Sequence, residues 1–154
     1  MNQLMSLLLI FFFILGAVKW KGNQDHAFSA QREISSASSS PCEGKNFCAV
    51  IYLAPWCPHC RDAIGETQTL ITKSAGASNV GIRVVVGAGN EKTNFEMAQE
   101  FRSNGETDND SRVARKLAVQ GFPSYFVLDK EGSIVLSGQE AHEWLLQKFG
   151  LMAI

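Results

Sequence analysis

Apolar residues change their spacing along the chain from residue 47 onward, which predicts alternating strands and helices. The run Phe47–Leu53 is almost wholly apolar, as is typical of a central strand covered on both faces. In the segment Val80–Val86, a valine or isoleucine stands at every second position, which predicts a second, mostly buried strand. Between them, apolar or small residues recur at helical spacing and predict one helix that ends between Ser74 and Ser78; they are Cys60, Ile64, Thr67 and Ile71.

The second half of the chain predicts further helices and a hairpin. Thr93 and Glu96 match a capping box, which predicts a helix from about Asn94 to Ser103. An acidic loop is expected next, followed by a short helix, a strand, a turn, a second strand and a closing helix. The loop is expected at Gly105–Asp110, and the short helix, capped by Asp108 or Asp110, is expected to run through Leu117. The two strands are expected at Tyr125–Leu128 and Ser133–Leu136, joined by a turn at Asp129–Gly132, and the closing helix at Gln139–Phe149.

This order of elements predicts an α/β domain. The first two strands are joined through a helix and are expected to be parallel, whereas the last two form an antiparallel hairpin. The expected architecture is therefore a mixed sheet with helices on both faces. We place this domain at residues 42–154.

The N-terminal region differs in composition from the rest. Residues 1–18 carry no charged side chain, and Leu4–Val18 is almost wholly apolar, which predicts a signal peptide or membrane anchor. Residues 19–41 are polar and serine-rich and predict a flexible linker. Lys19 and Lys21 argue against export, because positive flanks prefer the cytoplasm. The apolar segment nevertheless favours a periplasmic or otherwise extracytoplasmic domain that is anchored or secreted.

Composition limits the remaining classes of function. A chain of 154 residues, 45% of them hydrophobic, can bury one ordinary core. The formal net charge is −1 and no cluster of Lys or Arg is longer than a pair, so nucleic acid is not an expected partner.

The motif Trp56-Cys57-Pro58-His59-Cys60 places two thiols directly after the first predicted strand. If a helix begins at Cys57, its free backbone N–H groups and its dipole favour the thiolate of that residue. Cys57 is therefore the expected nucleophile, and Cys60 is expected to resolve the mixed disulfide. Pro58 suits the first helical turn, and a protonated His59 close by would favour the Cys57 thiolate further.

A metal site is the main alternative for these two thiols. A structural zinc site needs a second pair of ligands, and the other histidines, His26 and His142, are isolated in the sequence; we therefore expect no structural metal. Paired thiolates also suit soft metals, so a copper or haem-ligand carrier stays open. We expect His142 to be a solvated helix residue.

Cys42 and Cys48 are separated by five residues that can form a turn. One interpretation is a second disulfide, redox-active or structural, and export of the domain would favour it. The other makes Cys48 a small buried strand residue and leaves Cys42 free.

The Trp-Cys-x-x-Cys motif after a strand, together with Gly121-Phe122-Pro123 and a hairpin at Asp129–Gly132, resembles the thioredoxin-like superfamily. Residues 80–132 look most like its membrane-tethered, extracytoplasmic TlpA-like branch, and Pro58-His59 is similar to the DsbA oxidases. The resemblance implies a cis peptide bond at Pro123 and a client groove lined by Trp56, Phe122 and Pro123, although Trp56 and Phe122 also suit ordinary core packing. Ile51 stands where thioredoxins and DsbA have an acid, and this departure argues against fast turnover.

The resemblance implies an extracytoplasmic protein thiol-disulfide oxidoreductase. It needs no organic cofactor, and its partners would be protein thiols or disulfides, a redox partner protein and, through the N-terminal segment, a membrane. The direction of electron flow stays open, because thioredoxin and DsbA differ by about 150 mV, or about 7 kcal/mol for two electrons. The alternatives are a reductase dedicated to cytochrome c or copper-site maturation, and a module that binds metal or client without turnover.

Overall fold

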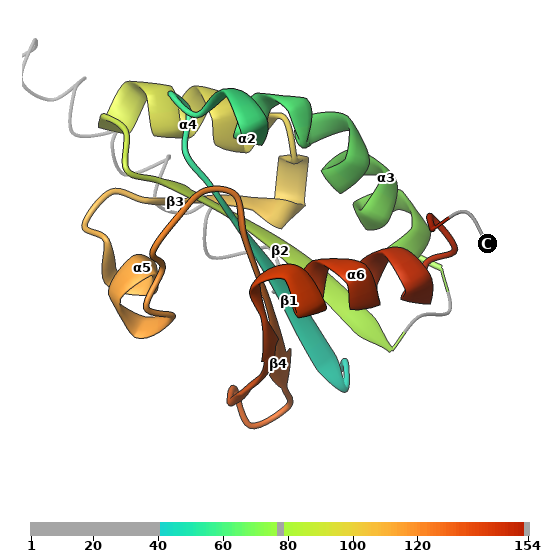
Figure 1. The fold of residues 1–154 in the computed structure, drawn as a ribbon. Coiled ribbons are helices and arrows are strands. Elements are labelled where there is room, and N and C mark those ends of the chain that lie inside the picture. Colours follow the sequence, from blue (N-terminus) through green and yellow to red (C-terminus); the bar gives the residue numbers. More distant parts are fainter. Residues whose placement is uncertain (1–40, 77–78, 153–154) are drawn as a thin grey trace, which may run out of the picture. The chain divides into compact units, whose positions relative to one another are not determined.

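The computed structural model describes residues 41–76 and 79–152. Within them, five strands form one sheet in the order β3-β2-β1-β4-β5 (Figure 1). β1 pairs in parallel with β2 and antiparallel with β4, and β4 and β5 form an antiparallel hairpin, so the predicted mixed sheet is confirmed. The strands are β1 (Phe47–Leu53), β2 (Val80–Gly87), β3 (Gly105–Asp108), β4 (Ser124–Asp129) and β5 (Ile134–Ser137).

The helices cover the two faces of this sheet unequally. α3, α4 and α6 pack on one face, and α5 packs on the other. The helices are α2 (Pro58–Asp62), α3 (Ile64–Ser74), α4 (Glu91–Gln99), the 3-10 helix η1 (Arg102–Asn104), α5 (Arg112–Lys116) and α6 (Gly138–Lys148). In Figure 1, α2 and α3 follow each other along the same side of the sheet.

Alternation along β1 divides the core in two. Ala49, Ile51 and Leu53 point to the face that carries α3, α4 and α6, whereas Val50 and Tyr52 point to the face that carries α5. All five are at most 1% exposed. Side chains of successive strand residues point to opposite faces, so a strand with apolar residues at every position must be covered on both sides.

The predicted acidic loop at Gly105–Asp110 is wrong for its first four residues, because Gly105–Asp108 is the edge strand β3. It pairs in parallel with β2 from Val84↔Gly105 to Gly87↔Asp108. An edge strand has one neighbour and stays short and polar, so it lacks the apolar pattern of a central strand. Gly105 is required there, since an added Cβ would overlap the Ala98 carbonyl.

The predicted helix starts also need correction. α4 begins three residues earlier than expected, because Asn90 is its N-cap and accepts the Thr93 N–H at 2.9 Å. Thr93 lies inside the first turn, where its hydroxyl donates to the Asn90 carbonyl. The helix predicted after Cys57 divides at Ala63 into α2 and α3. The closing helix and the short helix after Asp108 are confirmed.

The predicted signal or anchor at residues 1–18 lies outside the described residues, as does nearly all of the predicted linker at 19–41. In the part of the chain that is described, no helix is both long enough and apolar enough to span a bilayer.

Candidate active site at Cys57 and Cys60

Both thiols of the motif lie at the C-terminal end of β1, where the chain turns into α2. Cys57 is the N-cap of α2 and Pro58 is its first residue, as the sequence predicted. The turn is held by the Cys57 N–H, which donates to the Ala54 carbonyl at 3.1 Å, and by the Arg61 Nε, which donates to the Pro55 carbonyl at 3.0 Å. His59 is exposed on the first turn of the helix.

The two cysteines are free thiols and both are buried. Cys57 keeps 6% of its surface exposed and Cys60 keeps none, so Cys57 is the more accessible of the two. The loop before β4 covers Cys57, because its Sγ donates to the Phe122 carbonyl at 3.5 Å.

Cys60 is held as a protonated thiol. Burial raises its pKa to about 12, the neighbouring Cys57 adds to this rise, and the Ala54 N–H opposes it by donating to Cys60 Sγ at 3.4 Å. Ile51, which stands where thioredoxins have an acid, is fully buried in the same core cluster as Cys60 and supplies no proton acceptor. The Cys60 thiol is consequently protonated at neutral pH.

The loop before β4 brings the predicted groove residues to Cys57. The Phe122–Pro123 peptide bond is cis, as the resemblance implied. Trp56 is 58% exposed, which excludes core packing for this residue, and its ring meets that of Phe122 edge-on at a centroid distance of 5.5 Å. Phe122 is half-buried and also contacts Tyr52. Trp56, Phe122 and Cys57 thus form one contiguous group.

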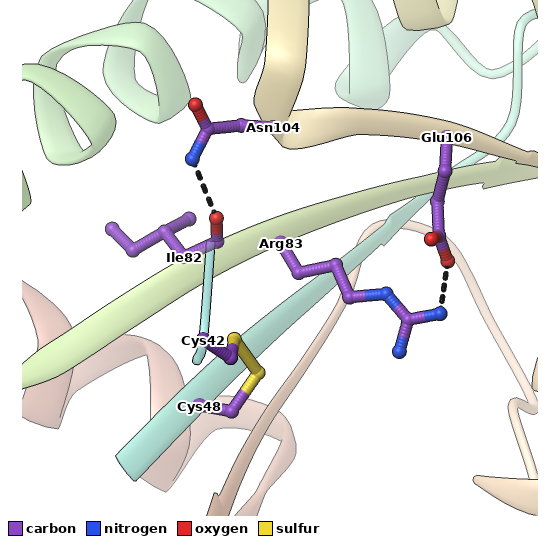
Figure 2. The surroundings of a disulfide bond; sticks show 6 residues. All are labelled: Cys42, Cys48, Ile82, Arg83, Asn104 and Glu106. Atoms are coloured by element: carbon purple, nitrogen blue, oxygen red, sulfur yellow. Dashed lines mark hydrogen bonds and ion pairs between the residues drawn. A yellow bond between two sulfur atoms is a disulfide. The ribbon is translucent and has the colours of Figure 1, made fainter. Parts of the chain in front are cut away.

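Cys42 and Cys48 form a disulfide at the opposite end of β1 (Figure 2). Cys48 is the second residue of the strand, whereas Cys57 follows its last residue, so this bond does not touch the Cys57 thiol. Gly81, opposite Cys48 on β2, lets the loop pack closely, because a Cβ there would overlap the Pro41 carbonyl. The structure thus separates the disulfide from the free pair.

His142 does not match the prediction of a solvated helix residue. Its Nε2 lies 2.7 Å from Glu66 Oε1, and its ring stacks on Tyr125 at a centroid distance of 4.2 Å. This contact joins α6 to α3 over β4. The residue pattern within α6 does not predict this contact, because Glu66 and Tyr125 both lie outside α6 in the sequence. Among the described residues, no group of three or more His, Cys, Asp or Glu side chains is placed to bind a metal.

Comparison with known proteins identifies the family. The profile of the thioredoxin-like domain family matches residues 37–151, and the chain therefore belongs to that family. Fold, family and the free cysteine pair define a thiol-disulfide oxidoreductase. Comparison with curated protein sequences finds no relative.

Solved structures share the fold at low sequence identity. The exposed lipoprotein thioredoxin Etrx1 of Streptococcus pneumoniae is 19% identical with a TM-score of 0.55, over 71% of this chain and 87% of that one. The N-terminal domain of PilB from Neisseria meningitidis is 17% identical with a TM-score of 0.54, over 70% and 81%. StoA from Bacillus subtilis is 15% identical with a TM-score of 0.51, over 70% and 85%. These likenesses concern the fold.

Proposed function

We propose that the protein exchanges disulfides with protein thiols through Cys57 and Cys60. The observation that carries the proposal is the pairing of one thiol that keeps some surface beside the cis Phe122–Pro123 loop with a second, fully buried thiol one helical turn away. The first can capture a client sulfur, and the second can displace it.

In the reducing direction, the Cys57 thiolate attacks a client disulfide and one client sulfur leaves, taking up a proton. Cys60 then loses its proton and attacks Cys57 Sγ, which forms the Cys57–Cys60 disulfide and releases the second client thiol. The client gains two electrons and the protein loses two. The oxidising direction is the reverse, and the reduction potential of the pair decides between them.

Trapping tests this proposal. A Cys60→Ser variant keeps the attacking thiol and loses the resolving one, so mixed disulfides with protein clients should accumulate and disappear on reduction. Cys57→Ser is the matched control and should give none. Absence of adducts with Cys60→Ser would favour the alternative module that binds metal or client without turnover. Equilibration of the pair with glutathione then measures the potential: a value near that of DsbA indicates an oxidase, and one near thioredoxin or below indicates a reductase.

We propose further that the domain works outside the cytoplasm. The Cys42–Cys48 disulfide supports this location, because structural disulfides persist in oxidising compartments and are rare in the cytosol. The apolar residues 1–18 support it independently as an export signal or anchor. Acid quenching of cells followed by alkylation tests it: Cys42 and Cys48 should resist alkylation until a reductant is added. Prompt alkylation of both would place the domain in a reducing compartment.

A further inference from the structure

Trp56 depends on the loop between β2 and α4 for its orientation. Its indole N–H donates to the Ala88 carbonyl at 2.8 Å, while its ring edge contacts Phe122. Trp56 is 58% exposed, so these two contacts, and not burial, hold its indole beside Cys57. The position of the Ala88 carbonyl therefore sets the position of the indole.

Asn94 fixes that loop. Ala88 has a φ of +59°, a conformation that residues other than glycine rarely adopt, so its surroundings must hold it. The fully buried Asn94 accepts the Gly89 N–H at 3.1 Å and donates to the Gly89 carbonyl at 3.4 Å. The same amide nitrogen donates to Asn109 Oδ1 at 2.8 Å. A chain of contacts thus runs from Asn109 to Trp56.

A second chain of contacts ends at Phe122. Its ring lies 5.9 Å from the ring of the buried Tyr52, and the Tyr52 hydroxyl donates to Asp108 Oδ2 at 2.9 Å. Asp108 is 3% exposed and also accepts the N–H groups of Val113 and Ala114 at the start of α5. Phe122 therefore contacts a tyrosine ring whose hydroxyl is held by the Asp108 carboxylate.

We propose that the dipeptide Asp108-Asn109, at the end of β3, positions both aromatic walls of the client groove. The two chains of contacts begin at adjacent residues and end at Trp56 and Phe122, the side chains that flank Cys57. An exposed aromatic edge beside the reacting sulfur fits an extended peptide with an apolar side chain next to its cysteine. This inference rests on the proposed exchange with protein thiols, and it adds positioning residues that do not touch the sulfur.

Because the dipeptide acts through the aromatic walls, it should affect peptide clients and spare small disulfides. An Asn109→Ala variant removes the acceptor for Asn94 at an exposed position, so the fold should tolerate it. We expect KM for a disulfide-bonded peptide with leucine or tryptophan beside its cysteine to rise about tenfold, the equivalent of losing one or two contacts of about 1 kcal/mol. The kcat/KM for oxidised glutathione should change less than twofold.

Two variants make the test specific. Asn109→Asp keeps an oxygen acceptor and should restore most of the peptide affinity. Tyr52→Phe removes only the hydroxyl that contacts Asp108 and should raise the peptide KM in the same selective way. Equal effects of Asn109→Ala on peptide and glutathione, or no effect on either, would overturn the proposal, and if Asn109→Ala did not fold, Tyr52→Phe would decide alone. Full activity of Cys57→Ser toward both substrates would instead overturn the proposed function.

Discussion

Removing the disulfide at the start of β1 should lower stability and leave thiol exchange unchanged. We consider the double replacement Cys42→Ser with Cys48→Ser. The bond joins residues six positions apart, so it closes a loop of only seven residues. The chain-entropy relation for such a loop gives a loss of about 2 kcal/mol in the free energy of unfolding at 25 °C. For a domain of this size, that corresponds to about 8 °C in Tm.

Urea unfolding without reductant measures this loss. Both proteins should carry Cys57→Ser and Cys60→Ser, so that the Cys42–Cys48 bond is the only disulfide that differs between them. The midpoint should fall with little change in the slope, because the short loop restrains few residues of the unfolded chain.

Exchange kinetics, measured with Cys57 and Cys60 intact, should not change. Cys48 and Leu53 are five positions apart on β1, which at about 3.3 Å per residue is about 16 Å, and Cys57 lies beyond Leu53. Electrons cannot pass directly between thiols that far apart, since exchange requires sulfur to attack sulfur. A stability loss below about 0.5 kcal/mol would refute the entropic argument. A change in exchange rate of more than about twofold would refute the assignment of the bond as structural.

Three further outcomes follow from the buried groups. Iodoacetamide at pH 8 should modify Cys57 in the reduced native protein and spare Cys60, whose pKa burial raises to about 12; comparable labelling of both by peptide mass mapping would contradict this. Burial alone would raise the pKa of the Asp108 carboxyl, but hydrogen bonds from the N–H groups of α5 and from the Tyr52 hydroxyl lower it. The Asp108 carboxylate therefore contributes to the free energy of unfolding above the unfolded pKa of about 3.9, and this contribution is lost as pH falls through the folded pKa. Asp108→Asn should consequently be less stable than the wild type at pH 7 by about 1–3 kcal/mol. That gap should shrink below about pH 4 in urea titrations, and a gap independent of pH would show that the charge is irrelevant. Gly87→Ala should cost about 1–3 kcal/mol, because its Cβ would overlap the Tyr52 hydroxyl, whereas Gly65→Ala, in α3 with open space around it, should stabilise by about 0.5–1 kcal/mol; thermal melts with equal shifts would contradict the comparison.

The sequence by itself determined the order of the main elements and the chemistry of the site. A continuous apolar run located β1, alternating apolar residues located β2, turn residues between two short runs located the hairpin, and helical spacing located α6. Two thiols after a buried strand placed the reactive pair at a helix start, since that arrangement depends only on neighbouring residues. These features depend on residues that are close together in the sequence, so the sequence is sufficient to predict them.

Only the tertiary structure decided how distant segments meet at that site. β3 has no apolar pattern because an edge strand of four residues is held by pairing with β2. Cys57 is covered by the Phe122 carbonyl, 65 residues further along the chain. The His142 side chain is held by Glu66, 76 residues away. The convergence of Trp56 and Phe122 on Asp108-Asn109 is of the same kind. Such contacts arise from the packing of the sheet as a whole, which brings residues together that no spacing along the chain relates.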